Sequence, residues 1–243
     1  MATKLGSVVG YRSGIYNGYK VIGTQTLGLR GLVLWLKFNE GSGNIAYDSS
    51  FYNNHGTIYG ATWTDGKFGK ALSFDGVDDN CIIPDSESLR FKKAISIVAW
   101  VKFLESTTNQ IVTWREFLGK EGVCTFTSSK YNDYIIFFID GADGKRYSVN
   151  TRINWDIGKW TFIAATYSVE QEAIKVYKNA ELIGTKALNV DIEDSTGIDV
   201  QLFNVDFVKA IIDEVRLYNR ALSENEIKML YYNRIGAVPS KAI

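Results

Sequence analysis

Short runs of alternating apolar and polar residues, separated by turn residues, fill most of this 243-residue sequence. One long run, 94–103, shows the pattern. In an extended chain, alternate side chains point to one face, and here that face carries Ile95, Ile97, Ala99, Val101 and Phe103. Turn signals recur about every 8–12 residues. Many short strands at this spacing predict an all-β protein built as a sandwich or jelly roll.

The run at 211–218 carries an acid among apolar residues and leads into a helix. Asp213 shares its strand face with Val215 and Leu217, so we expect the carboxylate to point toward the core. A buried carboxylate needs a partner, because an unpaired one is costly. Ser223 followed by Glu226 is a capping box, which predicts one short C-terminal helix.

Composition excludes several classes of function. Lys plus Arg and Asp plus Glu both total 27, so the formal net charge is 0, and we expect no nucleic-acid partner. The single histidine, His55, argues against a His-based triad or a zinc site. No apolar stretch is long enough to span a membrane, and no secretory signal peptide is visible before Tyr11.

Residues 1–30 differ from the rest of the chain. Gly6, Gly10, Gly14 and Gly18 recur every four residues, which places all four on one face of an extended chain. We interpret residues 1–30 as an extended arm that lies on another surface, with a leader or a first hairpin of the domain as the alternative. No linker follows, so we expect one domain at 31–235 and a tail at 236–243.

Several segments together resemble the concanavalin A-like, laminin-G-like jelly-roll domains. These segments are 31–38, 48–57, 69–79, 95–102, 160–167, 176–184 and 212–223, so the resemblance covers roughly residues 31–232. The resemblance implies a two-sheet antiparallel jelly-roll sandwich. It also implies a non-catalytic domain that binds carbohydrates or proteins, of a kind that occurs in surface and virus-associated proteins. An extracellular surface or a virion is therefore the expected location.

The resemblance further implies a structural calcium ion. The implied ligands are Asp48, Asn53, the carbonyl of His55, and Asp213. Calcium binds about six to eight oxygens from carboxylates, amides and carbonyls, which a tight polar loop can supply. The alternative is that Asp213 accepts hydrogen bonds from amides of residues 53–56 without a metal. The acidic run 75–79 is interpreted as a turn between two strands.

Catalysis is not expected. A retaining glycosidase needs two carboxylates about 5 Å apart, often on one strand face in this fold. The motif Glu-x-Asp-x-x-Glu is absent, and neighbouring Asp213 and Glu214 are expected to point to opposite faces. Asp191, Glu193 and Asp194 are closely spaced, but they are interpreted as a solvated cluster in a polar loop. No phosphate-binding loop or nucleophile motif appears either.

Aromatic residues near the expected loops are candidates for sugar binding, because sugars stack on exposed aromatic faces beside polar groups. The candidates are Trp63, Trp114, Trp155, Tyr52 and Tyr131. Each has the alternative of belonging to the core. Cys81 and Cys124 either form one disulfide or remain buried thiols.

Two functions follow from these observations. The first is a lectin-like binding or adhesion module that recognises glycans or a surface partner and holds a structural calcium. The second is a structural subunit of a virion, filament or surface layer. In that case the jelly roll is the scaffold and residues 1–30 make subunit contacts in a homo-oligomer.

Overall fold

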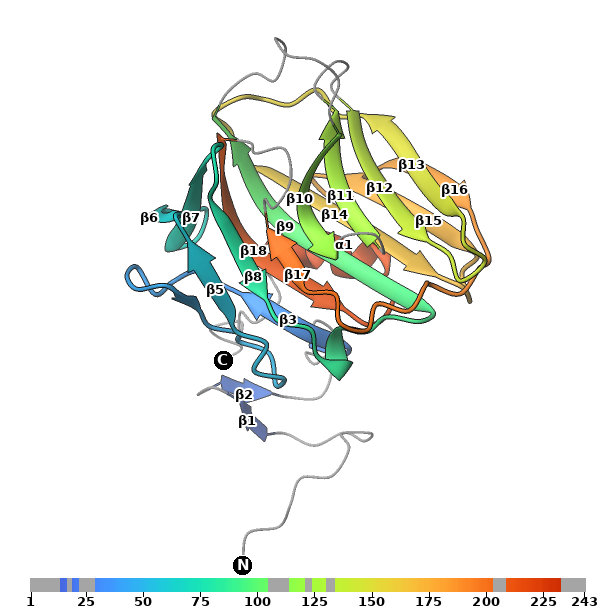
Figure 1. Ribbon diagram of the computed structural model, residues 1–243, viewed down its shortest axis with the longest axis horizontal. Coiled ribbons are helices and arrows are strands. Elements are labelled where there is room, and N and C mark those ends of the chain that lie inside the picture. The colour runs from blue at the N-terminus through green and yellow to red at the C-terminus, as the bar shows by residue number, and fades with distance from the viewer. Residues whose placement is uncertain are drawn as a thin grey trace, which may run out of the picture. The chain divides into compact units, whose positions relative to one another are not determined.

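The computed structural model describes residues 14–16, 19–21, 29–104, 114–120, 124–129, 134–202 and 209–232 (Figure 1). At 14–16, 19–21, 114–120 and 124–129 the description is of the backbone. The chain divides into two compact units, one of residues 31–222 and one of residues 1–30 with 223–243. No helix in the described part of the chain is long and apolar enough to cross a membrane.

Two antiparallel sheets build the unit of residues 31–222. The first sheet contains, in spatial order, β13 (Arg146–Arg152), β12 (Tyr134–Asp140), β11 (Cys124–Ser129), β10 (Trp114–Lys120), β17 (Val200–Leu202), β8 (Asn80–Ile83), β5 (Gly56–Tyr59) and β4 (Ile45–Ala46). The second contains β16 (Glu181–Ala187), β15 (Ala173–Lys178), β14 (Thr161–Ser168), β9 (Ala94–Phe103), β18 (Lys209–Tyr218), β7 (Lys70–Asp75) and β6 (Thr62–Asp65), and β3 (Leu32–Leu36) also pairs with β18.

The core lies between these sheets and follows the predicted alternation. The five apolar residues expected on one face of β9 all belong to one buried cluster with Phe137 of β12 and Ile163 of β14. Cys81 of β8 lies in the same cluster as a free thiol, and burial raises the pKa of this thiol to about 12. The predicted two-sheet jelly-roll sandwich is therefore confirmed.

Strand β18 departs from the predicted alternation at Glu214. This residue has a left-handed backbone conformation, with φ 55°, and the pairing with β9 shifts register between Asp213 and Arg216. Such a β-bulge adds one residue to the strand and changes which face the following side chains take. Ile212 and Val215 consequently both lie in the core, whereas Asp213 lies opposite Trp100, outside the core cluster. The expectation that Asp213 shares the face of Val215 and Leu217 is wrong for this reason.

The other unit contains the predicted helix. Ser223 is the N-cap residue of α1 (Glu224–Tyr231). Its Oγ accepts a hydrogen bond from the Glu226 N–H, and the Glu226 carboxylate accepts one from the Ser223 N–H. This is the predicted capping box. In the N-terminal segment, β1 (Gly14–Tyr16) and β2 (Tyr19–Val21) pair as antiparallel strands. The rest of the predicted arm before residue 29 lies outside the described residues.

Candidate functional site

Exposed aromatic side chains gather on the loop between β4 and β5. In this loop, residues 47–55, Tyr47 is 56% exposed, Phe51 66% and Tyr52 50%. We call it the aromatic loop. A contiguous patch of large exposed apolar side chains is typical of an interaction surface. Tyrosine suits such a role because its ring is apolar and its hydroxyl is polar.

The carboxylate of Asp48 anchors this loop through hydrogen bonds. Its Oδ1 accepts hydrogen bonds from the backbone N–H groups of Trp35 and Ser50, both at 2.8 Å. Its Oδ2 accepts from Ser50 Oγ at 2.5 Å and from the Asn54 N–H at 2.9 Å. Because Trp35 belongs to β3, its bond attaches the start of the loop to a core strand, and the other three bonds close the loop onto Asp48. Hydrogen bonds to a charged acceptor are stronger than neutral ones.

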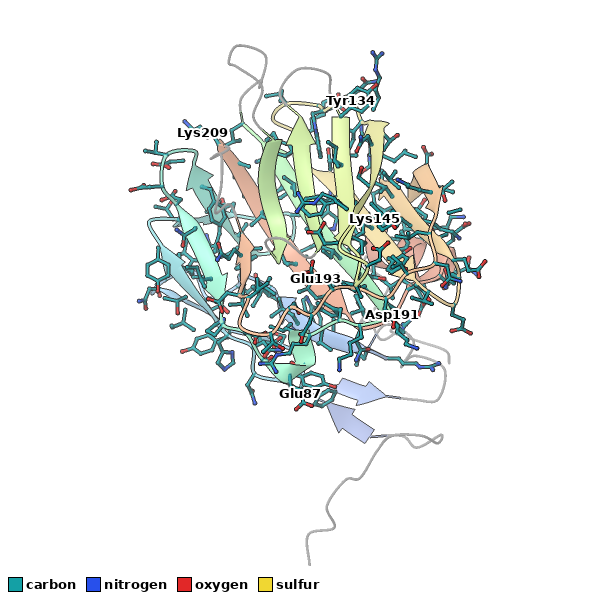
Figure 2. All side chains as sticks on the ribbon, turned by 45° about the vertical axis from the view of Figure 1, so that its right-hand side comes forward. Glu87, Tyr134, Lys145, Asp191, Glu193 and Lys209 are labelled. Atoms are coloured by element: carbon teal, nitrogen blue, oxygen red, sulfur yellow. The ribbon has the colours of Figure 1, made fainter. Side chains whose placement is uncertain are left out.

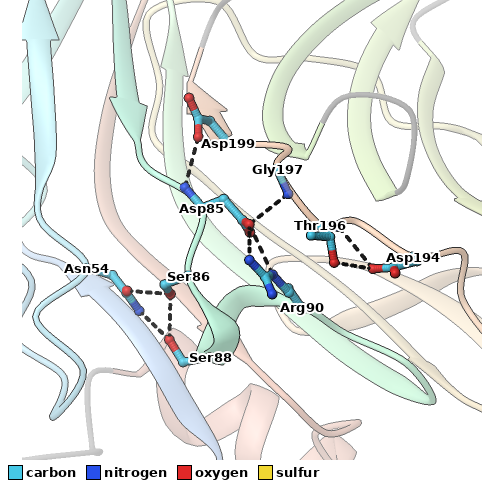
Figure 3. Close-up of polar contacts among 9 residues, drawn as sticks. All are labelled: Asn54, Asp85, Ser86, Ser88, Arg90, Asp194, Thr196, Gly197 and Asp199. Carbon is cyan, nitrogen blue, oxygen red and sulfur yellow. Dashed lines mark hydrogen bonds and ion pairs between the residues drawn. The ribbon is translucent and has the colours of Figure 1, made fainter.

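The side chain of Asn54 forms a second anchor. Its Nδ2 donates to the Val33 carbonyl at 2.8 Å and to Ser88 Oγ at 2.9 Å, and its Oδ1 accepts from Ser86 Oγ at 2.8 Å (Figure 3). Ser88 belongs to the short 3-10 helix η2 (Glu87–Leu89), and Ser86 precedes it. Asn54 is buried, so its full set of hydrogen bonds avoids an unsatisfied polar group.

A neighbouring network fixes the η2 segment in turn. Asp85 Oδ2 accepts from Arg90 Nε at 3.0 Å, from Arg90 Nη2 at 2.7 Å and from the Gly197 N–H at 2.8 Å (Figure 3). The Asp85 N–H donates to Asp199 Oδ1 at 2.8 Å. The segment that holds Asn54 is therefore tied to the segment before β17. All of these groups serve to order the surface that carries the aromatic loop.

His55 closes the aromatic loop at its far end. Its Nδ1 accepts a hydrogen bond of 3.0 Å from the Asp48 N–H, which places the ring proton on Nε2. The ring meets Tyr47 edge to face, with centroids 5.2 Å apart. Asn53 takes a left-handed conformation, with φ 56°, where asparagine is tolerated better than most residues. The loop is thus fastened along most of its length.

Asp213, one of the implied calcium ligands, contacts a loop other than the Asp48 loop. Asp213 Oδ2 accepts a hydrogen bond of 2.9 Å from the Phe68 N–H, in the loop between β6 and β7 rather than the loop at 53–56. Burial raises the pKa of Asp213 to about 7 although this N–H favours the charged form. A Cβ on Gly66 would lie 2.8 Å from Asp213 Oδ2, so the contact requires glycine.

The Asp48 loop is already complete without a cation. Each oxygen of Asp48 accepts two hydrogen bonds from the chain, which leaves no free direction for a metal ion. Asp48 therefore does not fit a calcium ion in this arrangement, whereas ligation by Asn53 and the His55 carbonyl stays a prediction.

A different acidic group has suitable geometry for a metal. Among the described residues, Asp75, Asp78 and Asp79 form the one group of three potential ligands, with carboxylate oxygens within 4.8 Å of one another. They lie in the turn between β7 and β8. Asp79 Oδ2 accepts from the Asp75 N–H at 2.7 Å, and burial, followed by nearby acids, raises the pKa of Asp79.

The aromatic candidates for sugar binding differ in their exposure to solvent. Tyr52 is exposed on the aromatic loop. Trp63 packs half-buried against the core and its Nε1 donates to the Gly43 carbonyl at 2.9 Å. Trp155 also packs half-buried against the core, edge to face with Phe103. The side chain of Trp114 and the whole of Tyr131 lie outside the described residues.

Sequence reasoning missed two of the three exposed aromatics of the loop, Tyr47 and Phe51. A signal was present, because the run 47–52 holds three aromatics between two turn clusters. Glu214, the acid next to Asp213, is buried. Its carboxylate forms an ion pair with Arg216 and accepts from Trp35 Nε1 at 2.9 Å.

Comparison with known families gave one clear match. A family model described as the concanavalin A-like lectin/glucanases superfamily matches residues 75–228. No curated protein matches the sequence at a significant level. The match covers more than half of the chain and agrees with the observed sandwich.

Two similar solved structures are described as binding domains. The binding domain of Paraclostridial Mosquitocidal Protein 1 superposes with a TM-score of 0.71 at 17% identity, over 85% of this chain and 53% of that one. The botulinum neurotoxin serotype G binding domain gives 0.66 at 17%, over 84% and 51%. This chain thus spans about half the length of both.

A third similar structure matches over nearly its full length. It is domain 4 of AbnA, an extracellular arabinanase of family GH43 from Geobacillus stearothermophilus, in complex with arabinotriose. Its TM-score is 0.62 at 22% identity, over 82% of this chain and 98% of that one. At such identities the likeness establishes the fold.

Proposed function

Because this chain belongs to the concanavalin A-like lectin/glucanases superfamily, we propose that it is a non-catalytic module that recognises glycans or a surface partner. The aromatic loop is the contact surface in this proposal. The observation that carries it is the exposure of Tyr47, Phe51 and Tyr52 on a loop fixed by Asp48 and Asn54.

An anchored loop favours binding for a physical reason. Ordering a flexible loop on binding costs conformational entropy, and a loop already held in place avoids that cost. The Asp48 and Asn54 hydrogen bonds supply this order before any ligand arrives. Support also comes from similar structures, which are described as binding domains or contain a bound oligosaccharide.

Substitution of Tyr52 tests the proposal. Tyr52→Ala should weaken binding to a retained polysaccharide by about tenfold, because loss of one stacking aromatic costs roughly 1–2 kcal/mol. Binding is measured by affinity electrophoresis and the melting temperature by calorimetry. Leu182→Ala, at a 46% exposed position on β16, is the matched control and should change neither. Equal binding by Tyr52→Ala and the parent protein would contradict the proposal.

The absence of catalysis is part of this proposal. Glu214 is committed to Arg216 and Trp35, and Asp213 is buried against the Phe68 amide. Neither acid is available to donate a proton to a glycosidic oxygen. Incubation with the bound polysaccharide should release no reducing ends, and release that Tyr52→Ala abolishes would overturn this part.

The calcium ion is placed at Asp75, Asp78 and Asp79 in the proposal. Three carboxylates in one turn repel one another, and a divalent cation offsets that repulsion. Calcium titration calorimetry should show one site that Asp78→Asn removes, whereas Asp65→Asn, on the exposed end of β6, should leave it unchanged. An unchanged melting temperature after chelation, together with no calorimetric signal, would contradict this placement.

The alternative of a structural subunit rests on residues 1–30. Of these the structure describes β1, β2 and residues 29–30, so the predicted homo-oligomer contact stays a prediction. Light scattering of the full chain and of a chain lacking residues 1–30 tests it. A larger particle that shrinks to a monomer on truncation would support it, and two monomers would oppose it.

A further inference from the structure

The residues around the aromatic loop contain almost no charge. From residue 41 to residue 64 the sequence has no lysine or arginine, and its one acid is Asp48. The same chain has 27 basic and 27 acidic residues, so this stretch is unusually neutral. The groups it offers to solvent are aromatic rings, hydroxyls and amides.

The charge that the stretch does contain is internal. Asp48 is 8% exposed, and its four hydrogen bonds come from the protein itself. His55 accepts a hydrogen bond through Nδ1, so its ring is uncharged in this arrangement. A ligand on the exposed face of the loop would therefore meet Tyr47, Phe51 and Tyr52 without a charged partner.

Several described basic residues near the stretch contact other parts of the protein. Lys67, the first after the stretch, lies over the Trp100 ring at 4.4 Å. Arg90 is bound through two nitrogens to Asp85, and Lys70 Nζ lies 2.8 Å from Asp65. Lys37 lies over the Trp35 ring at 4.1 Å, and burial lowers its pKa.

Two acids lie near the loop, one in contact with it and one next to the residues that anchor it. Glu40 accepts a hydrogen bond of 2.9 Å from the Tyr47 N–H. Glu87, labelled in Figure 2, lies between Ser86 and Ser88, the two residues that hold Asn54. Like charges repel, so these acids disfavour the approach of a phosphate, sulfate or carboxylate on the ligand.

We infer that the aromatic loop takes a neutral oligosaccharide, bound by ring stacking and by hydrogen bonds to hydroxyl and amide groups. This inference rests on the proposed function and narrows its ligand class to uncharged glycans. A neutral sugar loses little on approach to Glu40 and Glu87, and its apolar ring faces match Tyr47 and Tyr52.

Binding to two sets of polysaccharides tests the inference. Neutral probes are arabinan and xylan, and anionic probes are heparin and polygalacturonate. Calorimetry at about 50 mM and about 500 mM NaCl separates electrostatic from stacking contributions, because salt screens only the former. We expect binding to a neutral probe, with a Kd that changes by less than about twofold with salt, and a roughly tenfold loss in Tyr52→Ala.

The other outcomes are distinct. Preferential binding of an anionic probe that falls steeply with salt, and is lost in Tyr52→Ala, would overturn the neutral ligand class while leaving the proposed binding function intact. Binding that Tyr52→Ala leaves unchanged would overturn the site itself. No binding to either set would overturn glycan recognition, and with it this inference. Tyr52→Phe, which keeps the ring, should retain most of the affinity if stacking dominates.

Discussion

The Asp48 carboxylate accepts a hydrogen bond of 2.9 Å from the backbone N–H of Asn54, six residues further along the chain. This contact closes the aromatic loop on itself. The same carboxylate also accepts the N–H of Trp35 in β3, so loop closure and attachment to the sandwich depend on one side chain. The exposed aromatic rings owe their positions to a buried acid.

Replacement of Asp48 should therefore lower the stability of the protein. Asp48→Ala removes a charged acceptor and leaves buried N–H groups without partners, at a cost of about 2–3 kcal/mol. Urea denaturation followed by tryptophan fluorescence measures the change. Asp156→Asn, at an exposed acid, should change the free energy of unfolding by less than about 0.5 kcal/mol. Equal stability of the two variants would contradict the anchoring role.

Replacement of Asn54 should loosen the loop more than it destabilises the fold. Asn54→Ala removes the hydrogen bonds to Val33, Ser86 and Ser88 but leaves its own N–H bonded to Asp48. Amide hydrogen exchange of residues 48–55 should become at least about fivefold faster, because local opening becomes easier. Exchange in β9 should stay unchanged and serves as the internal control. Unchanged exchange in the loop would show that Asn54 is not an anchor.

Asp213 should make stability depend on pH. Burial disfavours the charged form and raises its folded-state pKa to about 7, well above the ordinary aspartate value of about 3.9. The native state therefore holds a proton that the unfolded chain releases, and stability is greatest below about pH 4 and falls as the pH rises toward 7. The free energy of unfolding should fall by at most about 4 kcal/mol over this pH range.

Asp213→Asn removes the titrating group and keeps an oxygen for the Phe68 N–H. The free energy of unfolding of this variant, measured from pH 4 to pH 8, should lack the decline seen in the parent protein. Glu181→Gln, an exposed acid on β16, should keep that decline. A decline of the same size in Asp213→Asn would mean that other groups cause it.

The buried pair of Glu214 and Arg216 should show strong coupling. Removal of one partner leaves an uncompensated buried charge, which costs about 3–5 kcal/mol. Arg216→Met and Glu214→Gln should each lower the free energy of unfolding by more than half of the loss measured for the double variant. A double-mutant cycle from urea denaturation measures the coupling, and additive costs would refute it.

The sequence predicted those features that depend on local patterns. The face of β9 follows from simple alternation, and the start of α1 follows from Ser223 and Glu226, whose side chains bond groups three residues away. These signals need no knowledge of the rest of the chain. The resemblance to a family supplied the two-sheet arrangement, and the matched family model agrees with it.

The partner of Asp213 could not be found in this way. The bulge changes the strand face at Glu214, and glutamate is not a residue type that favours the left-handed conformation found there. The loop that receives Asp213 is set by Gly66 and Phe68, which are distant in sequence. For Asp48 the resemblance implied metal ligation, and the hydrogen bonds that its carboxylate accepts from Ser50 and Asn54 could not be read from the sequence.

In the aromatic loop, one set of residues fixes the backbone and a different set is exposed to solvent. Asp48 and Asn54 are buried and fix the course of the backbone through their hydrogen bonds, whereas Phe51 and Tyr52 are exposed. Because Asp48 and Asn54 supply those hydrogen bonds, the side chain at an exposed position such as Tyr52 can be exchanged without loss of them. One backbone can thus carry many recognition surfaces, which makes this loop a natural place for ligand preference to diverge among related chains and a practical site for a randomised binding library.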